Sequence, residues 1–314
     1  MHSLKTIALA TAIGAAAWIA RGDSRVEKTL TLAAGGSFSI RTDLGGVRVV
    51  GTDRPGARLV VTSTRDDLND LLSFQYEEGA GSASVVARKR HPISFFGNHG
   101  NSVRFEIEVP GETRVHVETS GGAIKVASLR GDTKLSTSGG GIEVRDHTGA
   151  VAANTSGGGI TLSHVHGRCR VETSGGGITA EAIDGAVDGD TSGGSIRFDG
   201  ITGDIHAHSS GGGIQIREAG GRVEADTSGG SVRVAFTRAN ARGGSIESSG
   251  GGVTVSIDPS VGLAIDASGD SVQADIPITV RGEISRRHLK GLLGSGGETL
   301  RLRTSGGSVH ILAL

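Results

Sequence analysis

The chain has 314 residues, among them 54 glycines but only 5 prolines, 7 phenylalanines, one tryptophan and one tyrosine. This composition excludes an aromatic-rich core, and 36% hydrophobic residues with balanced charge exclude disorder driven by charge excess. A formal net charge of −1 provides no overall field for nucleic acid, so we expect no nucleic-acid partner.

Residues 1–22 have the pattern of a secretory signal peptide or an N-terminal anchor. A short basic start precedes an apolar run from Ile7 to Ala20, and the small residue Ala17 suits cleavage. The run is shorter than the roughly 20 residues that span a bilayer, so cleavage is favoured over an uncleaved anchor. We therefore expect export to the periplasm, the cell surface or the medium, with membrane contact only through such an anchor.

Residues 23–110 predict the opening coils and the N-terminal cap of a repeat protein. Leu44-Gly-Gly-Val-Arg-Val49 is a degenerate copy of the repeat that follows, inside a region rich in strand-forming residues. A cap is needed because the end of a stack of strands presents open edges that invite aggregation.

A basic stretch with two aromatic residues interrupts this region. Arg88, Lys89 and Arg90 precede Phe95 and Phe96, which makes these five residues candidates for binding anionic lipid, polysaccharide or a protein. The alternative, which we favour, is that the phenylalanines pack in the cap while the charges are solvated.

Residues 111–236 contain a regular repeat of 18 residues. The triplet Ser-Gly-Gly recurs at this spacing at Ser120, Ser138, Ser156, Ser174, Ser192, Ser210 and Ser228. Apolar residues follow four and six positions later, as Ile160 and Leu162 follow Ser156, with a polar residue between them. A second alternating run includes Cys169, the only cysteine, in an inward column. Each unit therefore predicts two short strands joined by glycine turns.

One unit cannot cover its own apolar face, so the units must stack about 4.8 Å apart and turn each apolar column into a ladder. The predicted fold is an all-β, single-stranded parallel β-helix (solenoid) with 18-residue, two-strand coils. A right-handed helix is favoured because parallel crossovers are normally right-handed, although left-handed solenoids keep the question open. The column from Thr137 to Thr227 is expected to form hydroxyl bonds between like residues along the ladder.

Residues 237–314 carry the same pattern with irregular spacing. Copies begin at Ser249, Ser268 and Ser305, with longer insertions between them. We expect irregular coils and a C-terminal cap in this region.

Four segments together resemble a known family. They are the early Leu44–Val49 element, the strand Phe105–Pro110, the tandem Thr-Ser-Gly-Gly-Gly-Ile coils and the terminal segment that includes Leu302–Ile311. In this order they resemble the bacterial putative-adhesin β-helix family over nearly the whole mature chain. The resemblance implies a β-solenoid fold and association with the cell envelope, and it implies no catalytic residues.

One outward column offers specific chemistry. Asp190, His208 and Asp226 stand at the same position of three successive repeats, beside a parallel column of similar residues. Imidazole and carboxylate groups could bind zinc or copper there. We favour a solvated ladder in which alternating acid and imidazole relieve like-charge stacking, because no fixed metal motif is present. We therefore expect no metal and no other cofactor.

The sequence favours a noncatalytic surface or scaffold protein over an enzyme. Its partners would be an envelope protein, a glycan or another copy of the chain. A polysaccharide-acting enzyme is the alternative, because β-helices also host lyases and hydrolases, and Arg168, Arg170 and Asp188 form its best grouping. A third hypothesis is an accessory protein of envelope-stress signalling.

Overall fold

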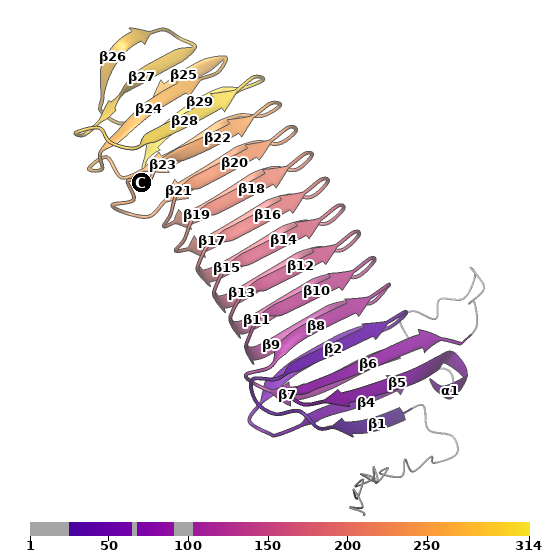
Figure 1. The fold of residues 1–314 in the computed structure, drawn as a ribbon. Helices are drawn as coiled ribbons and strands as arrows, with labels where there is room; N and C mark the ends of the chain where they lie inside the picture. The colour runs from indigo at the N-terminus through magenta and orange to yellow at the C-terminus, as the bar shows by residue number, and fades with distance from the viewer. Residues whose placement is uncertain (1–24, 65–67, 91–102) are drawn as a thin grey trace, which may run out of the picture.

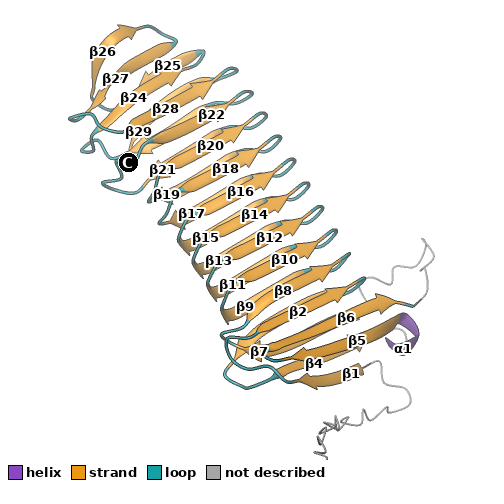
Figure 2. Cartoon of the chain, viewed as in Figure 1, coloured by secondary structure: helices purple, strands orange, loops and turns teal. Residues whose placement is uncertain are grey.

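The computed structural model describes residues 25–64, 68–90 and 103–314 and is an elongated stack of β-coils with two long faces (Figures 1 and 2). Residues 1–22 therefore lie outside the described part, and Phe95 and Phe96 lie outside it as well. A single four-residue helix, α1 (Leu68–Leu71), is present in the described ranges.

One face, sheet A, contains 14 strands. In spatial order they are β1 (Arg25–Leu30), β4 (Ala57–Ser63), β7 (Val103–Pro110), β3 (Gly46–Thr52), β9 (Ile124–Arg130), β11 (Ile142–Thr148), β13 (Ile160–His166), β15 (Ile178–Asp184), β17 (Ile196–Ile201), β19 (Ile214–Ala219), β21 (Val232–Phe236), β23 (Val253–Ile257), β29 (Ser308–Ala313) and β25 (Ser271–Ala274).

The other face, sheet B, contains 15 strands. In spatial order they are β26 (Ile278–Ile284), β27 (His288–Leu293), β24 (Leu263–Ser268), β28 (Thr299–Thr304), β22 (Gly244–Ser248), β20 (Val223–Thr227), β18 (Ile205–Ser209), β16 (Val187–Thr191), β14 (Cys169–Thr173), β12 (Val151–Thr155), β10 (Thr133–Thr137), β8 (Arg114–Thr119), β2 (Ser37–Thr42), β6 (Ser82–Lys89) and β5 (Leu72–Gly79).

The regular coils stack in parallel with the register that the repeat requires. In sheet A, Ile142 lies opposite Ile124 on one side and Ile160 on the other. In sheet B, Val151 lies between Thr133 and Cys169 in the same way. The predicted β-solenoid with two strands in each coil is confirmed, while the hand of the helix stays a prediction.

The core consists of the inward columns of both sheets. Ile160 and Leu162 are buried, as are their counterparts in the neighbouring coils. Where Gly189 leaves a gap in its column, Phe198 fills it, and a Cβ at position 189 would lie 2.7 Å from the Phe198 ring. The core is therefore close-packed from small and aliphatic residues, with a local aromatic side chain compensating for a glycine.

A column of residues in the left-handed backbone conformation breaks the alternation at the corner of each coil. The φ angles are 58° at Ser128, 49° at Asp146, 51° at His164, 52° at Ala182 and 50° at Glu218. Each of these residues turns its strand, so that the following residue points inward. This bend within the first strand of the coil could not be predicted from the sequence, because the column has no common residue type.

The threonine column forms a different set of hydrogen bonds from the predicted one. The Thr155 hydroxyl donates to the Gly140 carbonyl oxygen of the preceding coil at 2.7 Å and accepts from the Gly158 N–H of its own coil at 3.4 Å. The same donor bond is made by Thr119, Thr137, Thr173, Thr191, Ser209, Thr227, Ser248 and Thr304. A hydroxyl has one proton to donate. The predicted threonine-to-threonine bonding is therefore wrong, and each hydroxyl joins two turns instead.

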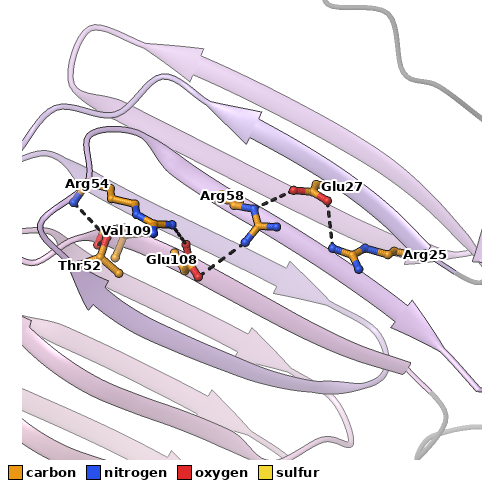
Figure 3. Close-up of polar contacts among 7 residues, drawn as sticks. All are labelled: Arg25, Glu27, Thr52, Arg54, Arg58, Glu108 and Val109. Atoms are coloured by element: carbon orange, nitrogen blue, oxygen red, sulfur yellow. Dashed lines mark hydrogen bonds and ion pairs between the residues drawn. The ribbon is translucent and has the colours of Figure 1, made fainter.

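Antiparallel strands close the N-terminal end of sheet A. Figure 3 shows their outer face, where Arg58 lies 2.7 Å from Glu27 and 3.7 Å from Glu108. Arg25 and Arg54 extend this chain of ion pairs at either end. Because these side chains are largely exposed, each pair contributes little alone, and the network mainly fixes the alignment of three edge strands.

Contacts between the two sheets close both ends of the stack. At the N-terminal end, the Thr31 N–H donates to the Glu78 carboxylate at 2.8 Å, and the Lys28 ammonium lies 5.7 Å from the Tyr76 ring centre. At the C-terminal end, the Val272 N–H donates to the Arg286 carbonyl oxygen at 2.9 Å. The β26–β27 hairpin of sheet B thereby reaches the last strand of sheet A.

His147 is a polar residue inside the core. It stands in an inward column between Leu129 and Val165 and is 1% exposed, and neither ring nitrogen has a hydrogen-bond partner of normal geometry. Burial lowers the pKa of His147, and the Ala150 backbone and the Asp132 carboxylate oppose that shift only in part. The ring is therefore neutral in the folded protein near pH 7.

We expect His147→Leu to stabilise the chain, and more so in acid. Because the folded pKa is lowered from the ordinary value near 6.5, the unfolded chain binds the proton more readily, and wild-type stability falls as pH drops through about 6.5. Leucine also removes two unsatisfied buried nitrogens, which should add about 1 kcal/mol or more at pH 7. Urea unfolding at pH 7.5 and 5.5 measures both effects. His310→Leu, on the outer face of sheet A, is the control. If the free energy of unfolding changed equally with pH in wild type and in His147→Leu, a buried, neutral His147 with a lowered pKa would be contradicted.

Candidate functional site

The column of Asp190, His208 and Asp226 forms on the outer face of sheet B as the register predicts. The three residues lie directly opposite one another on β16, β18 and β20. His208 Nδ1 is 2.5 Å from Asp226 Oδ2, and their side chains are 38% and 48% exposed. His208 is therefore paired with the carboxylate of the following coil.

The parallel column two residues earlier repeats this arrangement. Asp188, His206 and Glu224 lie opposite one another, and His206 Nδ1 is 3.7 Å from Glu224 Oε2. The two columns form an array of imidazole and carboxylate groups over three coils. In the part of the chain that the structure describes, no three His, Cys, Asp or Glu residues are grouped to hold a metal ion. In each column the close contact joins an imidazole to the carboxylate of the following coil, and whether the array acts as a charge ladder or holds a metal stays a prediction.

A shallow polar hollow lies beside the first column. It has a volume of about 370 Å³ and runs along the solenoid axis over four coils. Its lining includes Asn154, Glu172, Asp190 and His208 from the strands, and the turn serines Ser174, Ser192 and Ser210. The coil period thus places hydroxyl and charged groups side by side at regular intervals, an arrangement suited to an extended polar ligand.

The grouping proposed for a polysaccharide-acting enzyme is only partly assembled. Arg168 and Asp188 line a hollow of about 200 Å³ together with His206. Arg170 instead donates to Glu172 at 2.9 Å and lies 3.6 Å from Asp188, and the hydrogen bond with Glu172 raises the Arg170 pKa. The Arg170 cation and the Asp188 carboxylate are thus engaged with each other on an open surface.

The basic stretch lies at the N-terminal edge of sheet B. Arg88 and Lys89 end strand β6 with exposed side chains. Arg90 donates from its backbone N–H to the Leu71 carbonyl oxygen at 3.1 Å and from Nε to the Leu72 carbonyl oxygen at 3.2 Å. Arg90 therefore stabilises the junction of α1 and β5. Whether these residues bind a ligand with Phe95 and Phe96 stays a prediction, because the two phenylalanines lie outside the described residues.

Over residues 25–64, 68–90 and 103–314, no helix has the length and apolar character that crossing a membrane requires.

Comparison with known proteins identifies a family. The family described as Toastrack DUF4097 matches residues 39–312. We find no match to this chain among curated proteins.

Several solved structures are similar to the chain at low identity. A putative lipid binding protein from Parabacteroides distasonis is 12% identical, with 93% of this chain and 98% of that chain covered and a TM-score of 0.39. A putative adhesin from Bacteroides fragilis is 12% identical, with coverage of 92% and 97% and a TM-score of 0.33. A putative cell adhesion protein from Clostridium sporogenes is 12% identical, with coverage of 93% and 100% and a TM-score of 0.24. At these scores the neighbours carry no argument about what this chain binds.

We expect the Asp190, His208 and Asp226 column to behave as a charge ladder. Calorimetric titration with Zn²⁺ should show no stoichiometric binding, and chelator should leave the melting temperature unchanged. Raising the ionic strength should instead weaken the contribution of the pairs, because exposed charges are screened by salt. The melting temperatures of wild type and His208→Gln, each measured at low and at high salt, give the contribution of the His208 pair to stability. A one-to-one zinc site lost in both His208→Ala and Asp226→Ala would contradict this account.

Proposed function

The chain belongs to the Toastrack DUF4097 family, and we propose that it is a noncatalytic protein of the cell envelope. In this proposal the two long sheets are a rigid surface for structure or adhesion, and the partner is a glycan, an envelope protein or another copy of the chain. The observation that carries the proposal is the parallel stacking of the coils (Figure 1). The register of neighbouring strands places outward residues of successive coils in columns on both faces.

Cross-coil ion pairs support the proposed rigidity of these faces. On sheet A, Lys125 Nζ lies 2.9 Å from Glu143 Oε2, and Arg145 pairs with the other oxygen of the same carboxylate. On sheet B, Arg41 Nε donates to Glu118 across neighbouring strands at 2.5 Å. Individually such exposed pairs contribute little to stability, but they hold outward side chains in fixed positions.

Hydrogen bonds and ion pairs favour the charged form of several surface carboxylates. The hydrogen bond from Arg41 lowers the pKa of Glu118, and the one from Lys125 lowers the pKa of Glu143. In the described segments, the carboxyl groups with a displaced pKa are all displaced downward. A carboxyl group that acts as a general acid near neutral pH needs a raised pKa. These groups are therefore suited to permanent negative charge and to binding, and not to proton donation.

The proposed location is tested by cell fractionation of a C-terminally tagged full chain in a bacterial host. We expect the protein outside the cytoplasm, accessible to protease in spheroplasts, and shortened by cleavage after Ala17 as measured by mass spectrometry. Leu9→Arg interrupts the apolar run and should retain the chain in the cytoplasm. Leu314→Arg, at the opposite end, is the control and should be exported. Recovery of intact wild-type chain in the cytoplasm would contradict the proposal.

A further inference from the structure

The outer face of sheet B contains a third hollow, larger than the two described above, close to its N-terminal end. Its volume is about 680 Å³, within the range of roughly 300 to 1,000 Å³ that is typical of small-molecule sites. Four neighbouring strands line it, in the order β8, β2, β6 and β5, which lie side by side in Figure 1. It is separate from the ladder on β16, β18 and β20.

Serine side chains form the floor of this hollow. Ser37 and Ser39 on β2 lie opposite Ser82 and Ser84 on β6. Of these four serines, only Ser84 makes a side-chain hydrogen bond within the described part of the chain, a long one of 3.5 Å to Glu77. The other three hydroxyls are free both to donate and to accept hydrogen bonds.

The hollow exists because these positions carry short side chains. The column that contains Ser39 continues through His116 to Lys134 in the regular coils, where a long side chain covers the sheet. Two adjacent strands with serine at two successive outward positions therefore leave a depression. Its floor is polar and rich in hydroxyl groups.

Glycine at position 79 keeps one end of the floor open. A Cβ at Gly79 would lie 2.7 Å from the Ser82 hydroxyl oxygen, so a side chain there would extend over the floor. The backbone of Gly79 is not in the left-handed conformation, so its geometry does not require glycine. Glycine at this position therefore leaves this end of the floor uncovered.

Opposite charges stand at the two ends of the hollow. At one end the exposed Arg114 on β8 makes no side-chain hydrogen bond or ion pair within the described part of the chain, whereas its neighbour His116 lies 3.1 Å from Glu118. At the other end the exposed Glu77 lies on β5. Three strand spacings separate β8 from β5, which is about 14 Å at ~4.8 Å each. A ligand negatively charged along its whole length would be repelled at the Glu77 end.

We propose that this hollow binds a short oligosaccharide that carries an acidic sugar at one end. Arg114 pairs with the sugar carboxylate through its forked guanidinium. The serine hydroxyls exchange hydrogen bonds with the neutral sugars, and Glu77 accepts hydrogen bonds from sugar hydroxyls at the far end. The proposal rests on the proposed function, in which a glycan is one class of partner, and it names the class of glycan and its site.

The test is calorimetric titration of the purified full chain with 3′-sialyllactose, an oligosaccharide with its one acidic sugar at the end. Lactose is the neutral counterpart, and free sialic acid supplies the acidic group alone. We expect saturable one-to-one binding of 3′-sialyllactose and at least about tenfold weaker binding of the other two sugars, because each loses charged or hydroxyl contacts.

Two variants with a matched control test the residues. Arg114→Gln should weaken binding about tenfold or more, and Gly79→Phe should abolish it by covering the floor. Arg233→Gln, an exposed arginine on sheet A, is the control and should bind as wild type. Circular dichroism and melting temperature establish that each variant is folded. If Gly79→Phe does not fold, Arg114→Gln and the sugar series still test the site.

Three outcomes would overturn the proposal. They are no saturable binding of 3′-sialyllactose, equal losses in Arg114→Gln and Arg233→Gln, and binding of free sialic acid as tight as that of the trisaccharide. The sugar titration and the cell fractionation test separate claims. Fractionation measures where the chain is located and uses no sugar, so its result does not depend on whether the hollow binds one. A cytoplasmic chain that binds the sugar would refute the envelope role alone, and an exported chain that does not bind it would refute this site alone.

Discussion

Consecutive turns of the solenoid lie against each other backbone to backbone, and the whole stack depends on this contact. In the regular coils from Gly140 to Gly212, the second glycine of the Ser-Gly-Gly turn faces the carbonyl oxygen of the equivalent glycine in the preceding coil, and a Cβ at Gly140 or Gly158 would overlap that oxygen. The hydroxyl of the threonine or serine that ends the second strand of each coil bonds that same carbonyl, as Thr155 bonds Gly140. Buried carbonyl and N–H groups of the turns are thereby satisfied without any side chain between the coils.

The contact between turns determines which residues are buried and which are exposed. Because the turns fix the spacing of the coils, each inward position becomes a continuous apolar column and each outward position a column open to solvent. Outward residues can then vary without disturbing the stack. Charged columns such as Asp190 and His208 and the serine floor around Ser39 are built on the same backbone frame. Binding properties therefore depend on which outward side chains meet, and above all on where short ones leave a hollow.

The fold could be predicted from the sequence because the regular coils all have the same length of 18 residues. The 18-residue spacing of Ser-Gly-Gly gave the columns, the register and the two strands of each coil, including the alignment of Asp190 with His208. It did not reveal the threonine bonds to glycine carbonyls, because the partner lies in another coil at a separation of 15 residues, as in Thr155 and Gly140. The left-handed corners were missed because residues as different as Asp146 and Ala182 occupy them.

The candidate sites were predictable only where they follow the period. The hollow over Ser37 and Ser82 was not anticipated, because it joins strands whose separation in sequence has no relation to the repeat, and because its signal is small side chains and not conspicuous charge. A free arginine such as Arg114 is likewise recognisable only once its neighbours in space are known.

The most direct measurement of the central contact is the free energy of unfolding of Gly158→Ala compared with that of Gly159→Ala. Neither backbone is in the left-handed conformation, so the two variants differ mainly in where the new methyl group lies. At Gly158 it would overlap the Gly140 carbonyl oxygen, whereas at Gly159 it would lie 3.0 Å from the Gly177 oxygen, in a column that already holds Ala123 and Ser195. We expect Gly158→Ala to lose on the order of 3 kcal/mol and Gly159→Ala about 1 kcal/mol or less. Equal losses would contradict the claim that backbone contact at this glycine column sets the stacking of the coils.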